Sequence, residues 1–277
     1  MATIALDVMS GDLGAQECVP GALLALQSDP GLQLRLVGQS EPIEALLAAQ
    51  AQAAALRSRF EVVPAAEIVG MGEHPREAIR RKKHSSMRIA VDLVHGGRAD
   101  GAVSAGNTGA LTAIAHFVLK CLPAVERAPI MSAVPNARGF THMLDLGANT
   151  RATALQLEQF AVMGAIVARD VHGIAQPRVG LLNIGEEEIK GHELVREAHA
   201  LLRARAGADF DYVGFVEGHD IFTGEVDVVV TDGFTGNVAL KTMEGVAGLV
   251  RDRLREEFTS DLPSRLAGLF ARPVLRR

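Results

Sequence analysis

The chain has 277 residues, of which 48% are hydrophobic, enough apolar material for one large α/β domain or two small ones. Its formal net charge of -5, the absence of Trp and the single Tyr argue against nucleic acid as a partner, because the chain has no overall basic field and lacks most stacking side chains. The two cysteines, Cys18 and Cys121, are too few for a disulfide framework and fit the reducing cytosol. We predict a single α/β domain over residues 1–277 in a cytoplasmic protein.

Membrane-spanning segments, metal sites and nucleotide sites find no support in the sequence. The N-terminus reaches Asp7 after only a few apolar residues, too soon for a secretory signal, and no window approaches the roughly 18 apolar residues of a spanning helix. The nine histidines are scattered rather than paired on one helix. Neither Gly-x-Gly-x-x-Gly after a strand nor a nucleoside-triphosphate loop occurs. We expect no metal and no cofactor, in a protein that is soluble or attached to a membrane surface.

The first third of the chain alternates apolar strands, loops and helices. The first strand ends near Asp7 and is followed by a loop with Gly11, Asp12 and Gly14, and Ser40 is a good cap for a later helix. The predicted elements are a strand at 3–8, a helix to about residue 27, a strand at 32–37, a helix at 40–57 and a strand at 60–63.

The densest positive cluster of the chain follows, in a polar segment before a helix predicted at 86–94. Its members are Arg80, Arg81, Lys82 and Lys83. A solvated helix face and a landing site for an acidic partner or a phosphate group remain equally open.

The stretch at 103–115, VSAGNTGALTAIA, indicates an anion site. An apolar strand runs into Gly106, Asn107, Thr108 and Gly109 and then into a helix, so glycines allow close backbone approach while side-chain donors stand beside free N–H groups. An ordinary tight connection is the alternative. Ser104 also lies in a near-match to the nucleophile elbow of α/β-hydrolases, with Ala in place of the first Gly.

The second half repeats this plan. A strand ends in a loop with Asp145, Gly147 and Asn149. A later strand is followed by Glu186 to Glu188 and by Lys190, and then by a helix. The predicted elements are a helix at 152–168, a strand at 179–184, a helix at 192–205, a strand at 226–230, the loop TDGFTGN and a helix at 237–250.

Repeated strand-to-helix corners predict a predominantly parallel sheet with helices on both faces. Ligands of open α/β sheets bind at the carboxyl edge, so the polar residues of the corners should be neighbours. These residues are Asp7, Asp12, Asn107, Asn149, Lys190, Asp232 and Asn237. Lys190 and Lys241 could neutralise a phosphate or an oxyanion, or be surface charges, and the aspartates could equally cap their own loops.

Several segments stand in the order of a known family: LDVMSGD, RRKKHSSMRIAVDLV, VSAGNTGAL, DLGAN, LEQFAVMG, LLNIGEEEIKGHEL, GFVEGHDI and DVVVTDGFTGNVALKTMEG. Over nearly its whole length the chain resembles the bacterial phosphate acyltransferases of phospholipid synthesis. The resemblance implies transfer of a fatty acyl group from acyl carrier protein to inorganic phosphate, giving an acyl phosphate. It also implies a Rossmann-like three-layer α/β/α sandwich similar to isocitrate and isopropylmalate dehydrogenases, a homodimer, and loose attachment to the cytoplasmic membrane.

On this resemblance, phosphate attacks the thioester carbonyl and the carrier's thiol leaves. Our hypothesis assigns phosphate to residues 106–109 and gives Lys190, Lys241 and Asn107 catalytic roles on the phosphate or the oxyanion. The other predicted substrate contacts are Asp7, Gly11, Asp12, Asn149, Asp232, Thr235 and Asn237. A serine acyl hydrolase that uses Ser104, and a non-catalytic descendant that binds carrier protein or membrane, are the alternatives.

Two departures from the family are visible. Ser10-Gly11 stands where the family usually has paired glycines, and the family continues through a Gly-Gly-Ala-Pro loop and a His-Gly-Ser segment that this chain lacks. The tail at 249–277 is basic and amphipathic, which favours an interfacial membrane helix or a dimer-packing helix. Its apolar residues are Leu262, Leu266, Leu269, Phe270, Val274 and Leu275, and its basic residues after 261 are Arg265, Arg272, Arg276 and Arg277.

Overall fold

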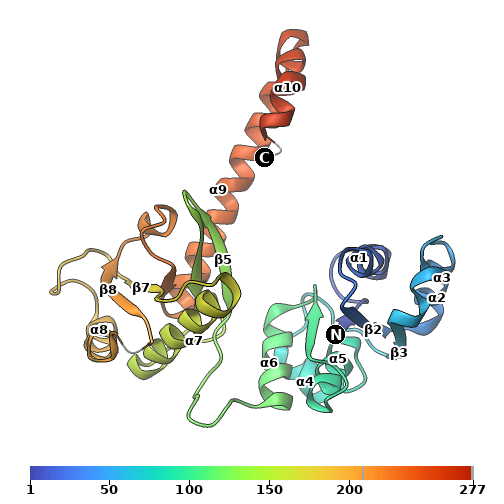
Figure 1. Cartoon of the computed structure of the whole chain (residues 1–277), viewed down its shortest axis with the longest axis horizontal. Coiled ribbons are helices and arrows are strands. Elements are labelled where there is room, and N and C mark those ends of the chain that lie inside the picture. Colours follow the sequence, from blue (N-terminus) through green and yellow to red (C-terminus); the bar gives the residue numbers. More distant parts are fainter. Residues whose placement is uncertain (208, 276–277) are drawn as a thin grey trace. The chain divides into compact units, whose positions relative to one another are not determined.

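The computed structural model of the protein describes residues 1–207 and 209–275 and divides into two compact units, Met1–Ala124 and Val125–Arg277 (Figure 1). The predicted α/β class with mostly parallel strands is confirmed. The strands form two sheets rather than the one that the corners suggested, because each strand pairs only within its own unit. A strand's sequence indicates that it is buried but not which strand it pairs with.

The sheet of the first unit is wholly parallel, in the order β3-β2-β1-β4. Its strands are β1 (Ala2–Asp7), β2 (Leu32–Gly38), β3 (Phe60–Pro64) and β4 (Gly101–Ser104). Its helices are α1 (Ala15–Ser28), α2 (Ser40–Ala48), α3 (Ala53–Leu56), the 3-10 turn η1 (Arg57–Arg59), α4 (Pro75–Arg81), α5 (Ser86–His95) and α6 (Thr108–Leu119). The helix predicted at 40–57 is therefore interrupted after Ala48, where no Gly or Pro marks the break.

Helices cover both faces of this sheet because successive strand residues point to opposite sides. Leu23 and Leu26 of α1 pack in one cluster with Leu34 and Leu36 of β2. On the other face, α5 joins a cluster that contains Ala5 and Val37. The first unit is thus an α/β/α sandwich.

The sheet of the second unit has the order β5-β6-β9-β7-β8, with β5 antiparallel to β6 and the other pairs parallel. Its strands are β5 (Met131–Asn136), β6 (Gly139–Leu144), β7 (Arg178–Leu182), β8 (Asp211–Val216) and β9 (Val228–Val230). Its helices are α7 (Ala154–His172), α8 (Glu193–Arg205), the 3-10 turn η2 (Asp220–Phe222), α9 (Gly233–Thr259) and α10 (Leu262–Leu275). Strands β5 and β8 were not predicted, because prolines or polar residues interrupt their apolar pattern.

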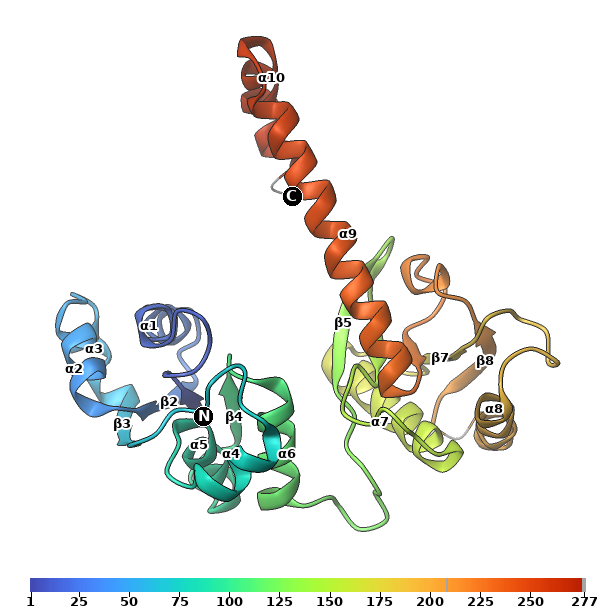
Figure 2. The same cartoon turned by 180° about the vertical axis from the view of Figure 1, so that it is seen from behind.

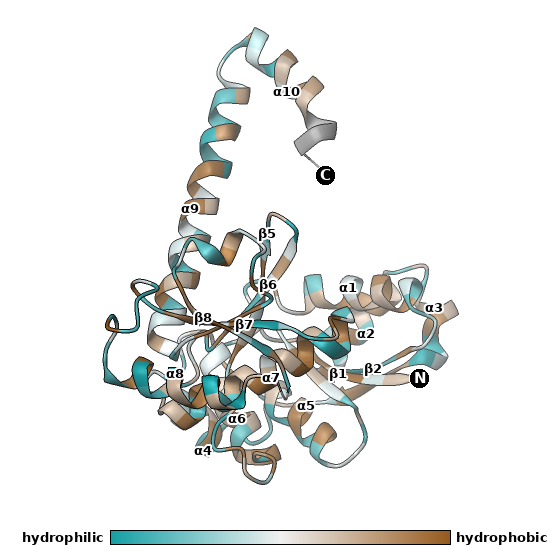
Figure 3. Ribbon diagram, turned by 60° about the vertical axis from the view of Figure 1, so that its left-hand side comes forward, coloured by the Kyte–Doolittle hydropathy of each residue, from teal (hydrophilic) through white to brown (hydrophobic). Residues whose placement is uncertain are grey.

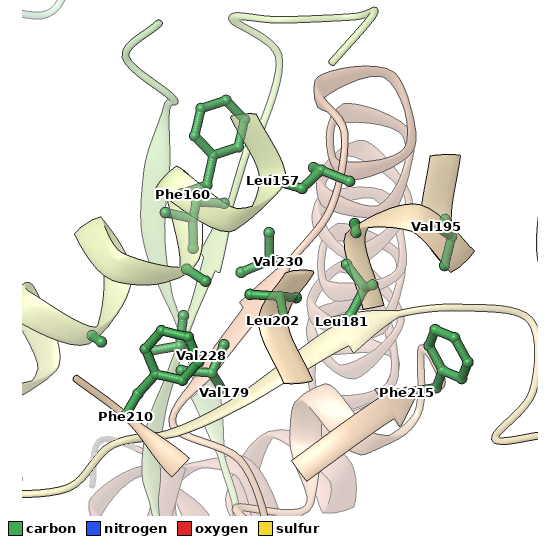
Figure 4. Packing of buried hydrophobic residues seen from close by; sticks show 14 of the residues in the cluster. Leu157, Phe160, Val179, Leu181, Val195, Leu202, Phe210, Phe215, Val228 and Val230 are labelled. Carbon is green, nitrogen blue, oxygen red and sulfur yellow. The ribbon is translucent and has the colours of Figure 1, made fainter. Parts of the chain in front are cut away.

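The core of the second unit lies on both faces of β9. Val228 and Val230 join Leu157 and Phe160 of α7 in the larger cluster (Figure 4), whereas Val229 faces a smaller cluster beneath the start of α9. The alternation along β9 therefore places α7 and α8 on one face and the first turns of α9 on the other.

Two polar side chains in this unit are unusually placed. His142 on β6 is only 6% exposed, stacks on His172 with centroids 4.9 Å apart, and has no hydrogen-bond partner for either ring nitrogen within the described residues. Burial, and then the charge of His172, lower the pKa of His142.

Asp227 accepts hydrogen bonds from Nε and Nη2 of Arg178 at 3.0 and 2.9 Å. Burial alone would raise the pKa of Asp227, but these bonds outweigh it and lower the pKa.

Helix α9 runs away from its sheet, and α10 folds back along it (Figures 1 and 2). A Cβ at Gly268 would lie 3.1 Å from Cβ of Phe258, so this glycine allows the two helices to approach. Hydrophobic and hydrophilic residues alternate along α9 (Figure 3). None of the described helices is long and apolar enough to cross a membrane. The predictions for Arg276 and Arg277, and for the side chains at 272–275, lie outside what is described.

Candidate functional site

The strand order of the first unit singles out the edge at which β1 and β4 end. The chain runs from β1 outward to β2 and β3 and then returns to the other side of β1 for β4. The connections leaving β1 and β4 therefore diverge, which is the topological switch point where open α/β sheets bind ligands. Asp7 and Ser104 are register partners at this edge.

The Asp7 carboxylate links the two corners. Ser104 donates its hydroxyl to Oδ2 of Asp7 at 2.7 Å and accepts from the N–H of Gly106 at 3.1 Å, while Oδ1 of Asp7 accepts from Met9 N at 3.2 Å. Asp7 is fully buried. Ser104 thus serves as a turn residue that ties β4 to β1, and its hydroxyl is already engaged.

Asn107 caps helix α6 and holds a distant loop. Its Oδ1 accepts from Ala110 N at 2.9 Å, and its Nδ2 donates to the carbonyls of Met71 at 2.7 Å and Glu73 at 3.1 Å. The predicted helix start is confirmed, but the side-chain donors are turned toward the 71–73 loop. Thr108 and Gly109 form the first turn of α6, and both residues are exposed. Their backbone N–H groups have no carbonyl partner within the helix and are therefore the groups available to an anion.

Two glycines let the corner loops touch. A Cβ at Gly106 would lie 2.7 Å from Cβ of Ser10, and Gly11, with φ of +91°, lies against Ala105. Asp12, the remaining predicted member of this corner, is exposed. The first unit therefore brings Asp7, Gly11, Gly106, Asn107, Thr108 and Gly109 together.

The positive cluster divides into one structural and three exposed side chains. Lys82 donates to the Ile68 carbonyl at 3.0 Å and pairs with Glu73 at 3.7 Å, next to the loop that Asn107 holds. The others, Arg80, Arg81 and Lys83, are exposed and form no ion pair among the described contacts. Their docking role stays a prediction.

In the second unit, Asp145 organises the loop after β6. This fully buried carboxylate accepts from the Nδ2 of Asn149 at 2.9 Å and from four backbone N–H groups. Three of these belong to the following loop residues Gly147, Ala148 and Asn149, and the fourth belongs to Ile130, just before β5. The sequence pointed to Asn149 but gave Asp145 no role of its own. A carboxylate that ends a strand just before Gly-x-Asn was the available signal.

Helix α9 begins against that loop. Asp232 caps it, accepting from Phe234 N and Thr235 N, and Oγ1 of Thr235 donates to Oδ2 of Asp232 at 2.6 Å. Gly233 N donates to the Asn149 carbonyl at 2.9 Å. The helix was predicted to begin at 237, but this capping starts it at Gly233.

Asn237 and the two candidate lysines lie on exposed surface. A Cβ at Gly147 would lie 3.6 Å from Cγ of Asn237, so this amide stands over the loop. Lys190 pairs with Glu187 and Lys241 with Glu244, each at 2.8 Å. The hydrogen bond that Lys190 donates to the Glu187 carboxylate raises the pKa of Lys190, so this lysine stays cationic at neutral pH. Among the described residues no cluster of His, Cys, Asp and Glu could hold a metal ion.

The corners of the second unit share one edge because β6, β9 and β7 are parallel. Asn149, Asp232, Thr235 and Asn237 are brought together there. Lys190 lies on the next corner along the sheet, and Lys241 is one helical turn beyond Asn237.

Comparison with known proteins identifies the family. The model of the family described as "Fatty acid synthesis protein" matches residues 2–277. The chain belongs to this family. Proteins named phosphate acyltransferase from Alkalilimnicola ehrlichii and Methylococcus capsulatus are each 54% identical over 99% of the chain, which spans 79% and 80% of their lengths. The counterpart from Pseudomonas fluorescens is 47% identical. The prediction of an acyltransferase of this family is therefore confirmed.

Solved structures agree on the fold. The EutD phosphotransacetylase from Staphylococcus aureus matches 89% of the chain and 82% of its own length with a TM-score of 0.61 and 18% identity. A phosphotransacetylase from Streptococcus pyogenes matches the same shares with a TM-score of 0.63 and 18% identity. The expected likeness to isocitrate and isopropylmalate dehydrogenases stays a prediction.

Proposed function

We propose that the protein transfers a fatty acyl group from acyl carrier protein to inorganic phosphate and releases an acyl phosphate. An oxygen of phosphate attacks the thioester carbonyl carbon, the carbon–sulfur bond breaks, and the thiol leaves with a proton. No covalent acyl-enzyme is needed. The family membership and the names of the relatives support this reaction.

The observation that carries the proposal is the start of α6 at the β1/β4 switch point. Free N–H groups at Thr108 and Gly109 favour a small anion, and Gly106 lets the turn before them pack closely against Ser10. Asn107 acts in this proposal by fixing the corner through its cap and its bonds to the 71–73 loop.

The second unit also carries groups that we assign to the chemistry. We assign Lys190 or Lys241 to the phosphate or the developing oxyanion, and Asn149, Asp232, Thr235 and Asn237 to substrate contact. A donor aimed at an oxyanion contributes about 3 kcal/mol to transition-state stabilisation, and positioning removes much of the encounter entropy.

A hydroxylamine trap tests the reaction. The protein is incubated with an acyl-carrier-protein thioester with and without phosphate, and hydroxamate is measured. We expect phosphate-dependent hydroxamate. Free fatty acid that forms without phosphate and disappears in Ser104→Ala would instead indicate a serine hydrolase, and an absence of turnover would indicate a binding protein.

The C-terminal helix α10 and the basic cluster are the surfaces that we propose for contact with other molecules. Leu266, Leu269 and Phe270 of α10 are 59%, 62% and 81% exposed, which suits contact with a membrane surface or with a second copy in a homodimer. The exposed cations at Arg80, Arg81 and Lys83 suit an acidic partner such as acyl carrier protein. We propose that the enzyme is cytoplasmic and peripherally attached to the membrane.

A further inference from the structure

A cavity of about 460 Å³ lies beside helix α8 in the second unit, lined also by Phe215 of β8 and by Glu188. Its volume falls within the range typical of small-molecule sites, roughly 300–1,000 Å³. Ala200 and Ala204 leave room along the helix, and Phe215 supplies an apolar wall. In Figure 4, Phe215 is set apart from Phe160, Val228 and Val230. The cavity plays no part in the acyl transfer proposed above.

The charged lining of this cavity favours an anion. The lining contains two arginines, Arg196 and Arg203, and one carboxylate, Glu188. Arg203 Nη1 lies 2.9 Å from Oε1 of Glu188, but the two side chains are 69% and 72% exposed, so the pair is weak and readily exchanged. Arg196 donates Nη1 to the Gly191 carbonyl at 2.7 Å and keeps further N–H groups for a ligand.

One ring nitrogen in the cavity wall has no hydrogen-bond partner. Nδ1 of His199 lies 2.8 Å from the hydroxyl of Tyr212. Burial raises the pKa of Tyr212, so the phenol stays protonated. The other ring nitrogen of His199, Nε2, is buried and, within the described part of the chain, has no partner.

The aromatic lining favours an aliphatic ligand over a flat ring. His199 and Phe215 stack on each other with centroids 4.4 Å apart, and Phe215 is only 7% exposed. Little aromatic face remains for a nucleobase, whereas the alanines and the Phe215 edge suit a methylene chain.

We propose that this cavity binds a single-chain amphiphile with an anionic head, a carboxylate or a phosphate monoester, whose chain lies along Ala200, Ala204 and Phe215 and whose head meets Arg196 and Arg203. Because Glu188 belongs to the loop that carries Lys190, an occupant that displaces Glu188 from Arg203 would also act on that loop.

The chain supplies its own reporter for this site. It has no Trp and one Tyr, so its intrinsic fluorescence comes from Tyr212, which hydrogen-bonds to a residue of the cavity wall. The whole protein is titrated with decanoate, decyl phosphate, decanol and inorganic phosphate. We expect saturable changes with the two anionic amphiphiles, binding of decanol at least about tenfold weaker, and no change with inorganic phosphate. The ratio of the two anion affinities identifies the preferred head.

Two pairs of variants localise the binding. Ala204→Phe, which fills the cavity from an exposed position, should weaken both anions at least about tenfold, whereas Ala45→Phe on exposed α2 should change nothing. Arg203→Gln should weaken them several-fold, and Arg169→Gln, which breaks a similar exposed pair with Asp170, should not. Undiminished binding by Ala204→Phe, or decanol bound as tightly as decanoate, would overturn the proposal.

Discussion

Gly236 of helix α9 lies against the backbone of Asp145, at the start of the loop after β6, and Gly236→Ala tests that contact. A Cβ there would overlap the carbonyl oxygen of Asp145, a backbone atom that cannot rotate away. Overpacking of this kind typically costs about 1–3 kcal/mol, against a gain of about 1 kcal/mol in helix propensity. We expect a net loss of up to about 2 kcal/mol, with about 2–4 °C in Tm for each kcal/mol.

Gly248→Ala is the matched control, because no atom lies within 4 Å of a Cβ at that position of the same helix. It should gain about 0.5–1 kcal/mol from propensity alone. Urea unfolding of both variants gives the comparison, and the hydroxamate assay reports whether Asn237 has shifted over Gly147. If Gly236→Ala proved as stable as Gly248→Ala, the proposed seating of α9 on the loop would be wrong.

Three further predictions follow from the contacts described above. Asn107→Ala should raise the KM for phosphate about tenfold, because the corner loses its cap and its tie to the 71–73 loop. Asn107→Ser, which keeps a cap oxygen without adding a charge, should raise it less, and an unchanged KM in Asn107→Ala would remove Asn107 from the site. Two groups with lowered pKa values, His142 and Asp227, contribute to the acid dependence of stability. His142 is neutral in the fold with a lowered pKa, so the unfolded chain takes up its proton first and stability falls as pH drops below 6.5. Asp227 has a lowered pKa, so its contribution is present above 3.8 and is lost as pH falls through its folded value. His142→Phe should flatten the first limb of urea midpoints against pH and Asp227→Asn the second, with a loss of about 1–2 kcal/mol at neutral pH for the latter; unaltered limbs would contradict these assignments. Leu269→Glu combined with Phe270→Glu should abolish co-sedimentation with anionic vesicles, and retention of binding would count against the membrane role of α10.

The sequence alone determined the local plan of this protein. Apolar runs ending in Gly, Asn and Asp predicted the strand-to-helix corners, since the backbone freedom of glycine and the capping ability of short polar side chains act within a few residues. The parallel α/β class followed from their repetition, and the family followed from the order of the motifs. The helix starts at Asn107 and Asp232 are local effects of the same kind.

Tertiary structure decided which corners meet and what their side chains do. The separation into two sheets depends on strand pairing over long sequence distances, which local patterns do not encode. The side chain of Asn107, predicted to face phosphate, binds carbonyls 34 and 36 residues away, because the 71–73 loop folds over α6. Three of the four backbone N–H groups that donate to Asp145 lie within four residues of it, but the fourth, of Ile130, comes from 15 residues earlier. The bonds of Asn107 to the 71–73 loop and of Asp145 to Ile130 form only when separate segments pack together, and for that reason the sequence could name the corners but not these partners of their polar atoms.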